Sequence, residues 1–229
     1  MKQLLFILVC SVALSGLAQD LKQEITAMNA HLEQLTDYRI TVDYSAGDTT
    51  DFFDQGEASV LVSNSGFFYQ TEFASMIING EHTIIVNEDE RALIYSDNQD
   101  TPKKSPSLND YVLQGMDTLV EQADSIYFST NGNQRIYHLR FKNGYFNLVE
   151  CTFEGAYLSK VVYFYNEAIV EEQGLTATCT VHIEEEPVYD KAMLTSDFYL
   201  THKNGAVVPS EHFTGYILIY NESIESFTE

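Results

Sequence analysis

The sequence predicts an α+β fold, in which helices cover the concave face of one curled antiparallel sheet. Three observations predict it. One amphipathic helix pattern follows an apolar leader, most of the remaining chain alternates apolar and polar residues, and a second helix pattern divides the strands into two groups. With 229 residues and 45% apolar composition, the chain can form one good-sized domain or two small ones.

Residues 1–18 have the features of a secretory signal peptide. A lysine supplies the positive start, an apolar run extends from Leu4 to Leu14, and Gly16-Leu17-Ala18 is a small-x-small cleavage site. About eleven apolar residues are too few to cross roughly 30 Å of hydrocarbon. We therefore expect an exported protein that begins near Gln19. A lipid anchor on Cys10 is the minor alternative, because valine stands where a lipobox has a small residue.

The first element after the leader is an amphipathic helix of about sixteen residues that begins at Asp20. Its apolar residues recur at steps of four, three, four and three, which places them on one face of the helix. They are Leu21, Ile25, Met28, Leu32 and Leu35.

The pattern then changes to a period of two, which is typical of half-buried strands. Ile40, Val42 and Tyr44 alternate with polar residues. Turn residues separate the next runs, and Asn79-Gly80 is the strongest hairpin signal. These runs occupy 57–62, 66–73, 75–78, 82–86 and 92–95. We expect a meander of antiparallel strands.

A polar loop leads from Asp97 to a second helix over 108–123, with Ser107 as its N-cap. The second group of strands follows, with a turn at Asn143-Gly144. These strands are expected at 135–141, 145–153, 158–165 and 175–183, and a less regular one at 216–220. The segment 184–229 has no assigned role and could extend the sheet, plug a hollow or dock a partner.

Cys151 and Cys179 remain after the leader is removed. In an oxidising compartment such a pair can form a disulfide, which would be worth about 3 kcal/mol in the chain-entropy model. Two small buried hydrophobic side chains are the equal alternative. Neither alternative makes the pair catalytic, since the sequence contains no Cys-x-x-Cys.

The charge balance excludes nucleic acid as a partner. The chain has 34 Asp and Glu against 12 Lys and Arg, a net charge of −22. A polyanion would be repelled, because its binding requires clustered cations. The acids are scattered along the chain, which indicates a solubilising coat.

The sequence contains no enzyme motif that we can identify. A serine hydrolase of the elbow type needs Gly-x-Ser-x-Gly, which is absent. The six histidines show no metal-ligand spacing. We expect no enzymatic activity, no catalytic residue, no cofactor and no metal site.

The order of elements and several loose motifs resemble the LolA-like superfamily of outer-membrane lipoprotein carriers. The resemblance is strongest over 20–183, and we expect a single LolA-like domain over 19–229. The segments that carry it are Tyr38 to Tyr44, Gly56 to Val62, Ile78 to Val86, Leu108 to Ala123 and Ile136 to Phe141.

The resemblance implies that the curled sheet is an unclosed or half β-barrel. It also implies a non-catalytic periplasmic chaperone for lipoprotein transport, which carries acyl chains in the hydrophobic hollow of that barrel. The implied partners are lipid acyl chains or a lipidated protein, together with membrane-protein donors or acceptors, and the expected state is a monomer. The family's lid-holding arginine has no counterpart in 63–69. A divergent relative similar to the RseB lipid-sensing regulators therefore fits as well. The alternative class is an exported structural or interaction module without a cavity.

The strands supply the residues expected to line this hollow. The chain has 14 Phe and 15 Tyr, and runs such as Phe67-Phe68-Tyr69 are apolar on both strand faces. Such runs occur where helices cover one face and a lipid or partner the other, and also where protein covers both. A slip of one residue in register would turn each set outward. The expected lining residues are Ile40, Val42, Val60, Val62, Ile84, Val86, Leu139 and Phe141.

Overall fold

The computed structural model describes residues 17, 20–48, 52–97, 118–170 and 174–221. Its strands are β1 (Asp37–Gly47), β2 (Phe52–Ser63), β3 (Gly66–Thr71), β4 (Ala74–Asn79), β5 (His82–Asn87), β6 (Ala92–Asp97), β7 (Ser125–Asn131), β8 (Gln134–Arg140), β9 (Phe146–Glu154), β10 (Tyr157–Tyr165), β11 (Thr176–Glu185), β12 (Leu200–Lys203), β13 (Ala206–Pro209) and β14 (Ile217–Tyr220). Its short helices are α3 (Glu167–Val170), η1 (Lys191–Leu194), α4 (Ser196–Tyr199) and η2 (Glu211–Phe213), and a longer helix occupies 20–32.

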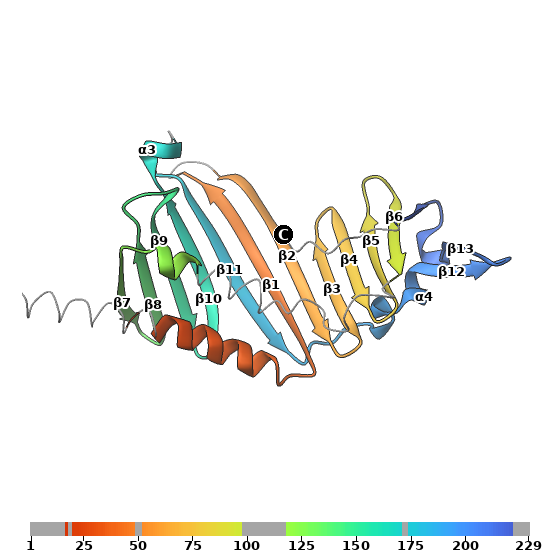
Figure 1. Ribbon diagram of the computed structural model, residues 1–229, viewed down its shortest axis with the longest axis horizontal. Coiled ribbons are helices and arrows are strands. Elements are labelled where there is room, and N and C mark those ends of the chain that lie inside the picture. The colour runs from red at the N-terminus through yellow and green to blue at the C-terminus, as the bar shows by residue number, and fades with distance from the viewer. Residues whose placement is uncertain (1–16, 18–19, 49–51, 98–117, 171–173, 222–229) are drawn as a thin grey trace, which may run out of the picture. The chain divides into compact units, whose positions relative to one another are not determined.

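Twelve strands form one sheet, in the order β14-β6-β5-β4-β3-β2-β1-β11-β10-β9-β8-β7 (Figure 1). The strands from β2 to β6 pair antiparallel with their neighbours in this order, and so do the strands from β7 to β11. β14 pairs parallel with β6. β12 and β13 form a separate antiparallel pair. The sheet ends in two different strands and is not closed into a barrel. The α+β prediction with a large unclosed antiparallel sheet is confirmed.

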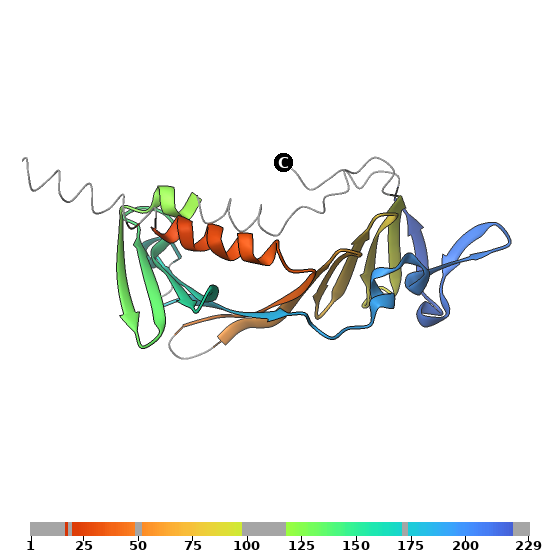
Figure 2. The same cartoon turned by 90° about the horizontal axis from the view of Figure 1, so that it is seen from below.

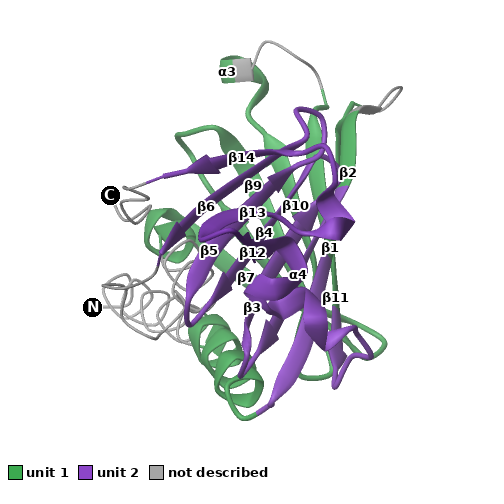
Figure 3. Cartoon of the chain, turned by 90° about the vertical axis from the view of Figure 1, so that its right-hand side faces the viewer, with its two compact units in different colours: residues 1–34, 42–56, 106–182 green, residues 35–41, 57–105, 183–229 purple. Residues whose placement is uncertain are grey.

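The chain divides into two compact units, shown in green and purple in Figure 3. Unit 1 comprises residues 1–34, 42–56 and 106–182, and unit 2 comprises 35–41, 57–105 and 183–229. The sequence predicted one domain over 19–229. The long strands β1, β2 and β11 each contribute residues to both units, and each unit has a core of its own.

The 20–32 helix builds the core of unit 1. Leu21, Ile25, Met28 and Leu32 are all buried, as their spacing predicted. The helix runs across the strands β8, β9 and β10 on one face of the sheet (Figure 2), and the backbone N–H of Leu158 on β10 donates to Met28 Sδ at 3.4 Å. It ends earlier than predicted, because a tight turn follows residue 32.

Alternate residues of β8 and β9 form the sheet face beneath this helix. Tyr137 pairs with Cys151, and Leu139 pairs with Val149. All four side chains are buried, and so is Phe153 on β9. Because side chains alternate along a strand, their sequence neighbours occupy the opposite face. Unit 1 therefore has a helix-covered face and an outer face.

In unit 2, Asn79 forms the hairpin turn that the sequence predicted. Its Oδ1 accepts hydrogen bonds from the backbone N–H groups of Glu81 and His82, both at 2.9 Å. Its Nδ2 donates to the Leu194 carbonyl at 3.2 Å and to Ser196 Oγ at 3.1 Å. The same side chain thus shapes the turn and anchors η1 and α4 to it.

The segment without an assigned role, 184–229, completes the core of unit 2. β14 extends the sheet beside β6, and Leu194, Tyr199 and Leu200 pack onto the sheet face. The strand residues of this cluster are Leu61, Phe68, Ile77, Ile84, Val86 and Leu93. The chain therefore covers this face of unit 2 with its own C-terminal segment.

The sequence did not predict β7, β12 or β13. In β7 the apolar residues Ile126, Tyr127 and Phe128 are consecutive, so no alternation marks a strand. Of the second helix expected over 108–123, the structure describes 118–122 as helical. The rest of that helix, and the expected leader apart from Leu17, lie outside the described residues. Within the described ranges no helix has both the length and the apolar character needed to span a bilayer.

Candidate functional site

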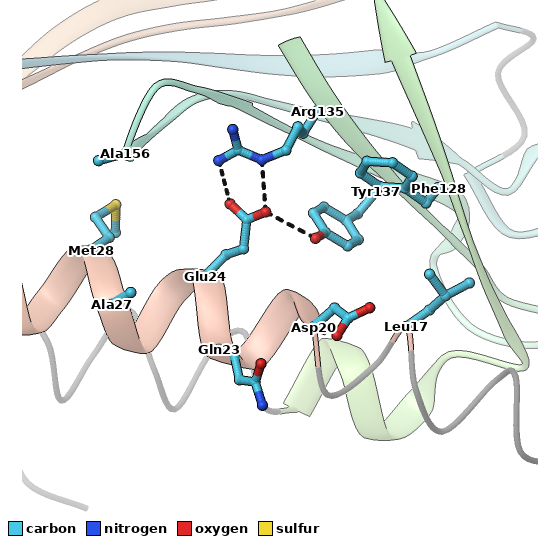
Figure 4. A pocket seen from close by; sticks show the side chains of 10 residues that line it. All are labelled: Leu17, Asp20, Gln23, Glu24, Ala27, Met28, Phe128, Arg135, Tyr137 and Ala156. Atoms are coloured by element: carbon cyan, nitrogen blue, oxygen red, sulfur yellow. Dashed lines mark hydrogen bonds and ion pairs between the residues drawn. The ribbon is translucent and has the colours of Figure 1, made fainter. Parts of the chain in front are cut away.

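A cavity of about 490 Å³ lies in unit 1 between the 20–32 helix and the strands β7 and β8. Figure 4 shows its lining side chains. The apolar part of the lining consists of Leu17, Ala27, Met28, Phe128 and Ala156. The helix supplies side chains here because the residues beside its buried stripe turn toward the edge of the sheet. We call this cavity the unit 1 pocket.

The polar part of the lining centres on an ion pair between the helix and the sheet. Arg135 Nε donates to Glu24 Oε1 at 2.8 Å, and its Nη2 donates to Glu24 Oε2 at 2.6 Å (Figure 4). The Tyr137 hydroxyl donates to Glu24 Oε1 at 3.0 Å. Arg135 Nη2 also donates to the Gly155 carbonyl at 2.8 Å. This two-pronged pairing fixes the helix against β8.

The pair sets the charge state of its members. The hydrogen bond from Arg135 lowers the pKa of Glu24 below its usual 4.5, although burial opposes the shift. Burial, followed by the hydrogen bond to Glu24, raises the pKa of Tyr137 to about 12. At neutral pH Glu24 is therefore a carboxylate and Tyr137 a neutral donor.

The pocket carries a small excess of negative charge. Asp20 and Glu24 oppose Arg135, and Gln23 is neutral. Arg135 Nη1 makes no hydrogen bond to the described residues. An anionic ligand would meet two carboxylates and a guanidinium already paired with one of them. The pocket thus suits an apolar chain whose nearby end is uncharged.

The sequence did not identify this pocket. Arg135 and Tyr137 are two positions apart on a predicted strand, so their side chains were expected on the same face of the sheet. Glu24 lies beside the apolar stripe of the predicted helix. The sequence signal for the pocket was a carboxylate at the edge of a buried helix stripe together with an arginine inside a strand. The residues next to each of them in sequence do not indicate that the two side chains would form a pair.

The structure does not bring the eight expected hollow residues together, and none of them lines the unit 1 pocket. Ile84 and Val86 lie in the unit 2 core, where Leu194 and Tyr199 cover them. Ile40, Val60 and Leu139 are also buried. Val42, Val62 and Phe141 are half-buried.

Strand β2 shows why the set divides. The register aligns Leu61 with Phe68, Phe68 with Ile77, and Ile77 with Ile84 across four strands. Leu61 therefore shares a face with Ile84, and its neighbours Val60 and Val62 lie on the other face. Lipid contact by any of these residues stays a prediction.

The two cysteines are free thiols in the structure. Val161 on β10 pairs with Cys151 on one side and Cys179 on the other. The cysteines are therefore two strand spacings apart, roughly 9.5 Å. A disulfide requires Cα atoms within about 7 Å. In the structure Cys151 and Cys179 therefore do not form a disulfide.

Across the described residues no three His, Cys, Asp or Glu side chains are grouped to hold a metal ion.

We expect the thiols to react in a fixed order. Burial raises the pKa of Cys151 to about 12, and it also raises the pKa of the half-buried Cys179. Because the thiolate is the nucleophile, iodoacetamide should label Cys179 slowly and Cys151 only after denaturation. Mass spectrometry of the native and denatured protein checks this. An intact mass that is two hydrogens short before reduction would show a disulfide and contradict the register.

No family model matches the chain, and no curated protein matches it. Solved structures do match. An uncharacterized conserved protein from Thermus thermophilus aligns with a TM-score of 0.44 and 12% identity, over 87% of this chain and 98% of that chain. A LolA superfamily protein from Nitrosomonas europaea aligns with a TM-score of 0.31 and 10% identity, over 77% and 97%.

A lipoprotein is also among the solved structures that align with this chain. Lipoprotein LppX from Mycobacterium tuberculosis also aligns, with a TM-score of 0.36 and 13% identity, over 75% of this chain and 98% of that chain. The aligned structures thus include a member of the LolA superfamily, the family that the sequence resembles. These alignments transfer no residue roles to this chain.

Proposed function

We propose that unit 1 binds an acyl chain of a lipid or of a lipidated protein in the unit 1 pocket, as a carrier exported to the periplasm, and that this binding involves no catalysis at the pocket. The cavity itself carries the proposal. Its volume of about 490 Å³ lies within the roughly 300 to 1,000 Å³ that is typical of small-molecule sites. Each buried methylene would contribute about 0.8 kcal/mol.

The leader supports both export and access. Cleavage after residue 18 would remove Leu17, which is one of the apolar side chains that line the pocket. The mature chain would then present a wider opening beside the start of the 20–32 helix. A carrier that acts only after export would gain its ligand access in the same step.

Filling the pocket is the direct test. Ala27 lines the pocket, whereas Ala30 lies on the same helix and is also exposed but lines no part of it. We expect Ala27→Trp to weaken binding of an uncharged fluorescent acyl ester by about tenfold or more, since the indole would occupy the space for several methylenes. Ala30→Trp is the matched control and should bind like the parent. Fluorescence titration of the mature chain measures both affinities.

The two variants are matched in a second respect. The chain contains no tryptophan, so each variant carries a single indole. We expect the indole emission of Ala27→Trp to change little on ligand addition, because the indole itself fills the site. Equal affinity of Ala27→Trp and Ala30→Trp for the probe, or no lipid in extracts of the purified mature chain, would contradict the proposal.

A protein-interaction module is the second candidate, and strand β14 favours it. β14 ends the strand order, and Ile217 and Ile219 on it are exposed. An exposed apolar end strand can pair with an extended peptide. A partner that binds Ala27→Trp and the parent equally well, without any bound lipid, would support this candidate over the carrier.

A further inference from the structure

The outer face of unit 1 carries a serine, a histidine and a glutamate in series. Ser129 Oγ lies 2.8 Å from His138 Nε2, and His138 Nδ1 lies 2.8 Å from Glu150 Oε1. The three residues come from the adjacent strands β7, β8 and β9. Their face is opposite to the unit 1 pocket, because Tyr137, the neighbour of His138, faces the 20–32 helix. The proposed carrier function makes no use of them.

The register explains the geometry. His138 lies directly across from Glu150 on β9 and from Tyr127 on β7, and Ser129 follows Tyr127 by two residues. The Tyr127 ring stacks on the imidazole at 4.3 Å with an interplanar angle of 7°. The imidazole is thus held by a carboxylate on one side and by a ring against its plane. Its side chain is only 13% exposed.

The protonation pattern follows from the chemistry of the partners. A carboxylate only accepts hydrogen bonds, so the neutral imidazole carries its proton on Nδ1 toward Glu150. Nε2 is then an acceptor, and the Ser129 hydroxyl donates to it. This is the arrangement in which a histidine acts as general base for a serine nucleophile.

Two side-chain amides lie on the same face of the sheet as the serine. Asn131 follows Ser129 by two residues on β7, and Gln134 is the cross-strand partner of Asn131 on β8. Both therefore belong to the outer face, about 6.6 Å along the strand from Ser129. Amide N–H groups of this kind stabilise the oxyanion of acyl-transfer intermediates. Asn133 at the turn donates to Glu154 Oε1 at 3.1 Å.

We propose that Ser129, His138 and Glu150 form an acyl-transfer site for small carboxylic esters. Ser129 Oγ attacks the ester carbonyl carbon while its proton passes to His138 Nε2. The bond from carbon to the alcohol oxygen breaks, and that oxygen takes the proton from His138. Water then adds to the acyl-serine by the same route, which releases the carboxylic acid and restores the serine.

A second serine-histidine-carboxylate series, in unit 2, differs from the Ser129 series in the surroundings of its serine. Ser196 Oγ lies 2.8 Å from His82 Nδ1, and His82 Nε2 lies 3.2 Å from Asp97. That serine is 7% exposed, and its oxygen already accepts a hydrogen bond from Asn79. It is a structural contact in the unit 2 core. Ser129 is half-buried, and among the described residues its hydroxyl bonds to His138 alone.

The test uses the mature chain with a fluorophosphonate probe and with p-nitrophenyl acetate. The probe should attach to Ser129, as mapped by peptide mass spectrometry, with Ser196 unlabelled. We expect Ser129→Ala to abolish labelling and to lower ester hydrolysis by on the order of 100-fold or more. Glu150→Gln should slow both by on the order of tenfold or more, since it no longer fixes the tautomer.

Ser125→Ala is the matched control, because Ser125 lies on the same face of β7 across from Arg140. It should retain the parent's labelling and hydrolysis. An unlabelled parent chain, or equal labelling of the parent and Ser129→Ala, would overturn the proposal. The mapping on the parent needs no variant to fold. Binding of the acyl probe by Ser129→Ala should equal that of the parent, so failure here is separable from failure of the carrier proposal.

Discussion

Replacing Tyr199 by alanine is expected to lower the free energy of unfolding of unit 2 by about 3 to 5 kcal/mol. Tyr199 is 2% exposed, and its ring stacks on Phe213 at 5.2 Å. Its hydroxyl donates to the Met193 carbonyl at 3.0 Å. The substitution would leave a cavity between the C-terminal segment and the sheet face that carries Ile84 and Val86.

Hydrogen exchange measured by mass spectrometry reports this loss in unit 2 directly. Peptides from β4 and β5 should exchange more than about 100-fold faster in Tyr199→Ala, as follows from a loss of about 3 kcal/mol. Tyr199→Phe keeps the ring and should cost only about 1 kcal/mol for the missing hydrogen bond. Val188→Ala is the surface control, since Val188 is 93% exposed. Unchanged exchange in Tyr199→Ala would show that the C-terminal segment does not stabilise this face.

Replacing Arg135 by methionine should have the second largest effect, a loss of about 2 kcal/mol in the docking of the 20–32 helix. Glu24 would remain partly buried beside Tyr137 without its cation. Adding Glu24→Gln should recover part of the loss, because the unpaired carboxylate is then removed. Arg39→Met is the matched control, since its pair with Glu184 is more exposed and should contribute less than about 1 kcal/mol.

The ion pair also gives the helix contact a defined pH range. The pKa of Glu24 is lowered in the folded chain, so its contribution is complete above the usual 4.5 and is lost as the pH falls through the lowered value. The pKa of Tyr137 is raised from 10 to about 12, so its contribution is complete below 10 and is lost as the pH rises toward 12. Thermal unfolding as a function of pH measures both.

Glu24→Gln separates these two ends of the range. It should remove the acid-side part that belongs to Glu24 and leave the other carboxylates unchanged. If the parent and Glu24→Gln lose stability identically on acidification, the Arg135 pair does not act as the structure indicates.

The expected elements were largely found where their periodicity was clean. The helix from Asp20 presents the four buried residues that its spacing predicted, and the Asn79-Gly80 hairpin forms through the asparagine side chain. Period and turn chemistry are local properties, so neighbouring residues suffice to specify them. β7 was missed because its apolar residues are consecutive.

The faces of the strands were harder to assign than the strands themselves. Val60, Leu61 and Val62 are all apolar, so β2 offers two equivalent faces. Only pairing with Phe68 and the strands beyond it decides that Leu61 enters the unit 2 core. The expected hollow set was chosen on the other face of β2, which is the one-residue ambiguity of any doubly apolar strand.

Local patterns in the sequence are enough to specify a sheet-rich α+β chain with an amphipathic helix at its start, an acidic composition and cysteines without a redox motif. The two sites, in contrast, exist only in the folded chain. Glu24 meets Arg135 across 111 positions of sequence, and Ser129, His138 and Glu150 come from three strands. Such contacts depend on strand order and register, which are set by the packing of whole faces and leave no trace in the spacing of neighbouring residues.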